Sequence, residues 1–81
     1  MTWIESDGQL VRSIKTPDFM TAFNLVTAVV GPAERLNHHP DIAFGWGYVN
    51  ITLTTHDAGG ITQKDHALAA RIDEAIKPFG V

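Results

Sequence analysis

The residues from Tyr48 to Thr55 alternate between two kinds of side chain, with Val49, Ile51 and Leu53 separated by polar residues. Successive side chains of an extended strand point to opposite faces of a sheet. The alternation therefore predicts a strand with one apolar face to bury and one polar face. If the extended geometry continues, His56 lies on the polar face.

Two short segments at the start of the chain, Trp3 to Ser6 and Gln9 to Lys15, flank the dipeptide Asp7-Gly8. This dipeptide tolerates the two positive φ angles of a type I′ turn, the usual turn of a two-residue hairpin. We therefore expect an antiparallel hairpin in which Ser6 pairs with Gln9. Apolar side chains occur on both of its faces, so the alternation does not identify the face that meets the core.

A helix is expected to begin at Thr16-Pro17-Asp18, which offers a hydroxyl at the N-cap, a proline at the first helical position and an acid in the first turn. Apolar residues then recur at spacings of three and four, which indicates one buried stripe. The members of this stripe are Phe19, Phe23, Val26, Val30 and Ala33. Gly31-Pro32 is expected to weaken or kink the helix, because proline has no N–H to donate. The pattern leaves open whether the helix resumes through Leu36.

Pro40 disfavours helical geometry at His39, so we expect it to end any continuing helix there. This places His38 and His39 at a junction between a helix and a strand. Ile42 to Phe44 is compatible with a short strand, and Gly45-Trp46-Gly47 is expected to form a bend.

A second helix is expected after the break at Gly59-Gly60. Thr62 and Asp65 have the spacing of a capping box, in which each side chain bonds the backbone N–H of the other residue. The apolar residues that follow share one face of the helix. They are Leu68, Ile72, Ala75, Ile76 and Phe79. Pro78 and Gly80 are expected to close the helix.

These elements follow in the order ββαββα along a single domain, residues 1–81. The order predicts an α+β fold, an antiparallel sheet of three to four strands with two helices packed on one face. A chain of this length buries only about 60–65% of its extended surface. Contacts between subunits are therefore expected to supplement a thin core, and we expect a homodimer or homotetramer.

The composition excludes several classes of function. Nine acidic and six scattered basic residues give a net charge of −3, so no basic stripe tracks phosphates and direct nucleic-acid binding is not expected. The absence of cysteine excludes disulfides, thiolate nucleophiles and Cys-containing metal sites. The chain opens without the features of a signal peptide, and its apolar runs fall short of the roughly 20 residues of a membrane span. We expect a cytoplasmic protein that is not in a membrane.

Three of the four histidines lie in two polar segments, Glu34 to Asp41 and Thr54 to Asp57. Histidine titrates near neutral pH, so imidazoles around one ligand can divide acid and base roles. The order Glu-x-x-x-His-His-Pro, an aromatic residue, a Val-x-Ile-x-Leu-x-Thr-His strand and an aspartate nine residues later resembles the pterin-4a-carbinolamine dehydratases. The resemblance runs without gaps from about Asp18 to Asp73. Its motif positions are Glu34, His38, His39, Pro40, Trp46, Thr55, His56 and Asp65.

The resemblance implies the dehydration of 4a-hydroxytetrahydropterin to quinonoid dihydropterin, in the recycling of tetrahydrobiopterin beside an aromatic amino acid hydroxylase. It implies no metal and no redox cofactor. His38, His39 and His56 are the implied acid–base set, with their individual roles left open because close imidazoles titrate together. The implied substrate-binding residues are His38, His39, Pro40, Thr55, His56, Asp57 and Ala58.

Three supporting residues each have two interpretations. Glu34 could orient an imidazole, or it could be a solvated residue on the last helical turn. Asp65 matches an active-site aspartate of the family, and the capping box explains the same residue structurally. Trp46 could stack on a flat heterocycle or pack against the protein.

Two other functions remain open. A chain of this fold could be a non-catalytic pterin-binding module, or a dimerisation or assembly module, although all three histidines favour the enzyme. A three-histidine metal site would need imidazole nitrogens about 2.0–2.1 Å from zinc. Adjacent His38 and His39 tend to point apart in an extended segment, which makes shared coordination awkward.

Overall fold

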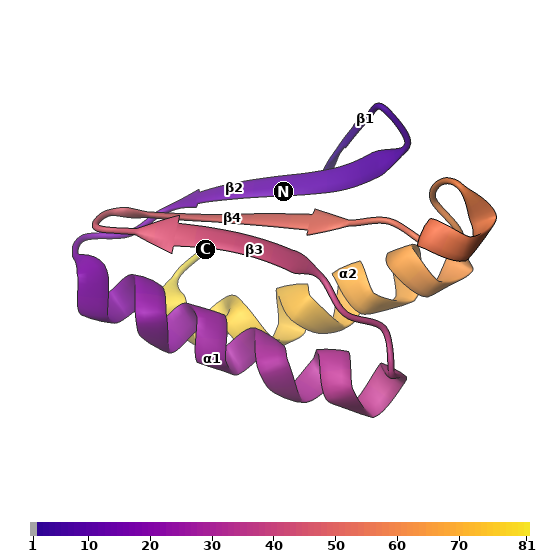
Figure 1. Ribbon diagram of the computed structural model, residues 1–81. Coiled ribbons are helices and arrows are strands. Elements are labelled where there is room, and N and C mark those ends of the chain that lie inside the picture. Colours follow the sequence, from indigo (N-terminus) through magenta and orange to yellow (C-terminus); the bar gives the residue numbers. More distant parts are fainter. Residues whose placement is uncertain (1) are drawn as a thin grey trace.

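The computed structural model describes residues 2–81, and in them both helices cover one face of a four-stranded antiparallel sheet (Figure 1). The strands are β1 (Ile4–Ser6), β2 (Gln9–Lys15), β3 (Asp41–Gly45) and β4 (Tyr48–Leu53), in the spatial order β1-β2-β4-β3. The helices are α1 (Phe19–Leu36) and α2 (Gln63–Ile76), with the short 3-10 helices η1 (His56–Ala58) and η2 (Lys77–Phe79). The predicted α+β fold is confirmed.

The hairpin of β1 and β2 forms at the predicted turn. Asp7 and Gly8 have φ angles of 51° and 75°, as a type I′ turn requires, and Ser6 pairs with Gln9. Within residues 2–81, neighbouring strands of the sheet run in opposite directions, so every strand pair is antiparallel.

Arg12 explains why the alternation of β2 could not identify its core face. Leu10 and Ile14 are buried on the side of the helices, and Arg12 lies between them on that same side, only 9% exposed. Its Nη1 donates to Asp73 Oδ1 at 2.5 Å, and the same oxygen accepts a hydrogen bond from Trp3 Nε1 at 2.9 Å. The charged Arg12 on the core face is thus paired with Asp73 of α2, and this pair links the hairpin to that helix.

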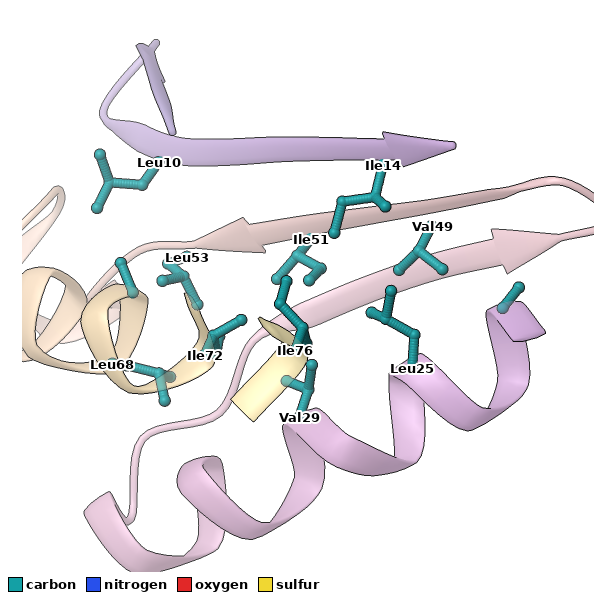
Figure 2. Close-up of a cluster of buried hydrophobic side chains, with 12 residues drawn as sticks. Leu10, Ile14, Leu25, Val29, Val49, Ile51, Leu53, Leu68, Ile72 and Ile76 are labelled. Carbon is teal, nitrogen blue, oxygen red and sulfur yellow. The ribbon is translucent and has the colours of Figure 1, made fainter. Parts of the chain in front are cut away.

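The core lies between the sheet and the two helices, as Figure 2 shows. The alternating residues of β4, which are Val49, Ile51 and Leu53, are fully buried at its centre. Leu25 and Val29 of α1 approach them from below the sheet in Figure 2. Burying a side chain of this size stabilises a fold by roughly 1.5–3 kcal/mol relative to leaving it exposed.

The N-cap of α1 is Asp18, so the prediction of Thr16 was wrong. Asp18 Oδ1 accepts a hydrogen bond from the backbone N–H of Thr21 at 2.7 Å. The backbone N–H of Thr16 instead donates a hydrogen bond to the carbonyl of Gly47 at 2.9 Å. Thr16 is therefore still bonded to the turn between β3 and β4, and the chain cannot become helical until two residues later.

The predicted buried stripe of α1 was wrong at three of its five residues, whereas Ala33 is buried and Val26 is partly buried against the core. The buried residues of this helix are Ala22, Leu25, Val29, Pro32 and Ala33. Phe19, Phe23 and Val30 are about half exposed, at 51%, 45% and 51%. Both sets have helical spacing because α1 is apolar over more than half of its circumference, so the spacing alone cannot choose between them.

The helix continues as one element through Gly31-Pro32 and ends at Leu36. Its C-cap is Asn37, which has the left-handed angles φ 50° and ψ 43°. The N–H of His38 then donates to the carbonyl of Ala33 at 3.1 Å. Asn37, rather than Pro40, therefore ends the helix, although Pro40 does lie at the junction with β3 as predicted.

Four element ends meet at one end of the molecule. In Figure 1, α1 ends, β3 begins, β4 ends and α2 begins on the same side, and the turn between β3 and β4 lies at the opposite side. The two polar segments that contain three histidines lie on the side where α1 ends and α2 begins, away from the turn between β3 and β4. Within residues 2–81, neither helix is long and apolar enough to cross a membrane.

Candidate active site

The antiparallel pairing of β3 and β4 brings the two histidine segments together. Asp41 at the start of β3 pairs with Thr52 near the end of β4, so the residues that precede β3 lie beside those that follow β4. The first turn of α2 adds Lys64. These segments line an open cavity of about 410 Å³. Its lining residues are Asn37, His38, His39, Thr54, Thr55, His56, Asp57 and Lys64.

His38 is held against a buried carboxylate. Its side chain is 12% exposed, and its Nε2 lies 2.6 Å from Oδ1 of Asp65, which is fully buried. The second oxygen of Asp65 accepts the N–H of Thr62 and the hydroxyl of Thr55, each at 2.8 Å. The capping box of α2 is therefore confirmed, and the same aspartate is also the partner of His38.

The hydrogen bonds keep Asp65 ionised. Burial alone would raise the pKa of this carboxyl, but hydrogen bonds from His38, from the Thr62 N–H and from Thr55 outweigh burial and hold the pKa below its ordinary value. Asp65 is thus a carboxylate at neutral pH and can stabilise positive charge on the neighbouring imidazole.

His39 has a partner of a different kind. Its Nε2 lies 2.6 Å from Oε2 of Glu34, and the two side chains are 55% and 69% exposed. Glu34 is therefore solvated on the last turn of α1 and also contacts an imidazole, as each of its two interpretations required in part. Exposed pairs of this kind typically contribute only about 0–1 kcal/mol, so the geometry of His39 is loosely held.

His56 reaches the cavity by a route that the sequence did not indicate. β4 ends at Leu53, and Thr55 forms an isolated bridge with Gly60 before His56 enters η1. The extended geometry therefore does not continue to His56, which was the condition for placing this residue on the polar face of the strand. Gly59, at φ 72°, closes the tight turn, and a left-handed residue is least costly at glycine.

Besides Asp65, which is buried behind His38, four predicted residues do not line this cavity. Pro40 and Glu34 line a second, largely apolar cavity of about 180 Å³ on the other side of His39. Ala58 is exposed at the end of η1. Trp46 is 73% exposed in the turn between β3 and β4, at the opposite end of the sheet, so this chain does not bring it to its own histidines.

Three cavity residues, Asn37, Thr54 and Lys64, were missed. Asn37 had a local signal, because asparagine tolerates the left-handed conformation of a helix C-cap. Lys64 had a weaker one, since a cation in the first turn opposes the helix dipole. Thr54 had none beyond its place beside Thr55.

The two adjacent histidines differ in their carboxylate partners. His38 and His39 use the same ring nitrogen, Nε2, for two different carboxylates. In the part of the chain that the structure describes, no three His, Cys, Asp or Glu side chains gather so as to hold a metal ion. The arrangement instead suits proton transfer, because three imidazoles with different surroundings line one polar cavity.

Comparisons with known proteins agree with this fold. A sequence model described as pterin 4 alpha carbinolamine dehydratase matches residues 1–75. A protein of Chloroflexus aggregans, assigned provisionally by its name to the pterin-4-alpha-carbinolamine dehydratases, is 48% identical over 73 residues, which are 90% of this chain and 78% of the relative.

Two solved structures are also similar. One is described as a transcriptional coactivator/pterin dehydratase from Brucella melitensis, with a TM-score of 0.82 and 33% identity over 90% of this chain and 80% of that one. The other is described as a pterin dehydratase-like protein and RuBisCO assembly factor of the alpha-carboxysome, with a TM-score of 0.75 and 27% identity over 93% of this chain and 89% of that one. Because the family model covers nearly the whole sequence and the relatives match over most of their own length, this chain belongs to the pterin-4a-carbinolamine dehydratase family.

Proposed function

We propose that this protein dehydrates 4a-hydroxytetrahydropterins to quinonoid dihydropterins by histidine acid–base catalysis. One observation carries the proposal: His38, His39 and His56 line a single polar cavity, and one of them is paired with a buried, ionised carboxylate. Family membership supplies the substrate class.

The reaction breaks the bond between C4a and its hydroxyl oxygen. One imidazolium gives a proton to the departing oxygen, which leaves as water, and a neutral imidazole accepts a proton from the pterin ring. The electron pair of the broken N–H bond restores a double bond in the ring, so no oxidation occurs. Positioned acids and bases of this kind accelerate a reaction by typically about 10²–10⁴-fold.

The polar groups around the histidines suit the binding of a pterin. The carboxylate of Asp57 offers an acceptor beside Thr55, which lines the same cavity, and the pterin ring presents several N–H donors along one edge. Pro40 and Ala58 stay in the proposal as flanking residues, and Trp46 could take part only from another subunit.

A stopped assay with chemically generated 4a-carbinolamine tests the function. We expect a rate above that of buffer and a loss of at least about 10²-fold when His39 is replaced by alanine. Wild-type protein without any rate above buffer would reject the enzyme and leave a non-catalytic pterin-binding or assembly module of the same fold.

We further propose that the protein works as a homodimer or homotetramer in the cytoplasm, beside an aromatic amino acid hydroxylase that supplies its substrate. The exposed apolar residues of α1 support self-association, because Phe19, Phe23 and Val30 lie along the helix beside the edge strand β3. An unpaired strand edge and a half-exposed apolar stripe are both satisfied by a second copy of the chain.

A further inference from the structure

The contacts of Asp65 have fixed directions. An ionised carboxylate can only accept hydrogen bonds, so each of its partners must donate. Oδ2 therefore accepts from the N–H of Thr62 and the hydroxyl of Thr55. Oδ1 accepts from Nε2 of His38, which must carry a hydrogen.

The two threonines form an ordered chain behind the carboxylate. A hydroxyl has one hydrogen, and that of Thr55 is given to Asp65. The bond of 2.7 Å between the hydroxyls of Thr55 and Thr62 must then be donated by Thr62. Thr62 Oγ1 in turn accepts the N–H of Lys64 at 3.3 Å, so every bond of the chain points toward Asp65.

We propose that Asp65 is a positioning residue whose two oxygens have separate tasks. Oδ2, anchored by Thr55 and Thr62, caps α2, and Oδ1 fixes His38 in the tautomer with hydrogen on Nε2. Neutral His38 can then accept a proton only at Nδ1, which assigns it the role of base in its neutral form. The tautomer stands on the hydrogen bonds alone, whereas the assignment as base rests on the proposed function.

Capping alone does not account for this arrangement. The capping box requires one oxygen of Asp65 and the N–H of Thr62, and that oxygen is Oδ2. Oδ1 is left over, and it lies 2.6 Å from the imidazole nitrogen inside a fully buried site. The contact between His39 and Glu34 has the same length, but both side chains are more than half exposed and can exchange the contact for water.

Asp65→Asn tests the division of tasks. The two donors at Oδ2 select the amide oxygen of asparagine for that position, and the amide NH₂ then faces Nε2 of His38. Nε2 must become an acceptor, so His38 should switch to the tautomer with hydrogen on Nδ1. Nitrogen-15 NMR of the imidazole at roughly pH 9, well above the ordinary histidine pKa, reports the tautomer directly.

The expected result is the Nε2–H tautomer in the wild type and the Nδ1–H tautomer in Asp65→Asn. Glu34→Gln is the matched control, because it makes the same chemical change beside His39 and should leave the tautomer of His38 unaltered. A wild-type His38 with hydrogen on Nδ1, or an unchanged tautomer in folded Asp65→Asn, would overturn the proposal. If Asp65→Asn does not fold, the wild-type spectrum still decides it.

Kinetics separate this inference from the proposed function. If the protein is a dehydratase, Asp65→Asn should lower kcat by about 10²–10⁴-fold, the scale of an imidazole held in the wrong tautomer, with a much smaller change in KM. Wild-type kcat in Asp65→Asn would overturn the role of His38 as base. An inactive wild type with the expected tautomers would reject the function and leave the positioning by Asp65 in place.

Discussion

His38 and His39 are adjacent in sequence, but their surroundings predict different consequences of removal. His39→Ala should lower the dehydration rate by about 10²-fold or more, and it should leave stability within about 0.5 kcal/mol, because the pair with Glu34 is exposed. His38→Ala should lower the rate as well and also cost about 1–3 kcal/mol of stability, since it leaves a buried acceptor of Asp65 unsatisfied.

Urea unfolding of the two variants, together with the stopped assay, checks this difference. The unfolding midpoint of His39→Ala serves as the reference for His38→Ala, because both changes remove one imidazole. Equal stability of the two variants would show that the bond between His38 and Asp65 contributes nothing to the fold.

The sequence could predict which residues gather at the candidate site but not how they pair. The motif predicted His38, His39 and His56, which line one cavity, and the capping-box spacing predicted Asp65 at the start of α2. The pairing of Asp65 with His38 depends on how closely the end of α1 approaches the start of α2, across 27 positions of sequence. No local sequence pattern reports how close these two helix ends are. The sequence alone therefore could not distinguish the buried pair of His38 and Asp65 from the exposed pair of His39 and Glu34.

Among the elements, the end of α1 sets the position of the histidine pair. Asn37 is left-handed, and this conformation costs most residues roughly 1–2 kcal/mol more than it costs glycine. We expect Asn37→Ala to lower the free energy of unfolding by about 1 kcal/mol and Asn37→Gly to leave it nearly unchanged. Chemical unfolding of the three proteins measures this, and equal losses in both variants would mean that the asparagine side chain, rather than its backbone angles, ends the helix.

Local signals predicted some elements well, but for α1 they predicted the helix without its correct buried face. The turn at Asp7-Gly8 and the cap at Thr62 are decided by a few adjacent residues, and both formed as predicted. β4 was recognised because only one of its faces is apolar. The rotation of α1 is decided by the sheet that it packs on, so the half-exposed Phe19, Phe23 and Val30 were mistaken for buried residues.

At the scale of the whole molecule, that exposed stripe predicts self-association. Phe23 is 45% exposed and packs at 6.5 Å from the ring of Phe44 on the edge strand β3. Light scattering at micromolar concentration should show a dimer or tetramer, and Phe23→Asp should shift it toward monomer by placing a charge in the apolar contact.

Asn24→Asp is the control for this experiment. It adds the same charge one residue along α1, at an exposed position turned about 100° from Phe23, and should leave the assembly intact. A wild-type monomer at these concentrations, or equal dissociation by both variants, would contradict association through the stripe.

Acid should weaken both helices at once, because the N-terminal cap of each contains an aspartate that is hydrogen-bonded in the folded state, Asp18 for α1 and Asp65 for α2. Hydrogen bonding by Thr21 holds the pKa of Asp18 below its ordinary value of 3.8, and the bonds from His38, Thr62 and Thr55 overcome burial to do the same for Asp65. A lowered folded pKa means that the stabilisation is fully present above the unfolded value and is lost as the pH falls through the folded value.

The free energy of unfolding should therefore change little from these two groups between pH 7 and about pH 5, and fall progressively below it. Asp65→Asn should be less stable at neutral pH but lose less on acidification, because asparagine has no proton to bind. Asp18→Asn should reduce the pH dependence of the free energy of unfolding by less than Asp65→Asn does. Its effect should also shrink in high salt, since Asp18 is fully exposed. Urea unfolding between pH 2.5 and 7 measures all three curves, and an Asp65→Asn curve parallel to that of the wild type would show that the buried carboxylate keeps the same pKa whether the chain is folded or not.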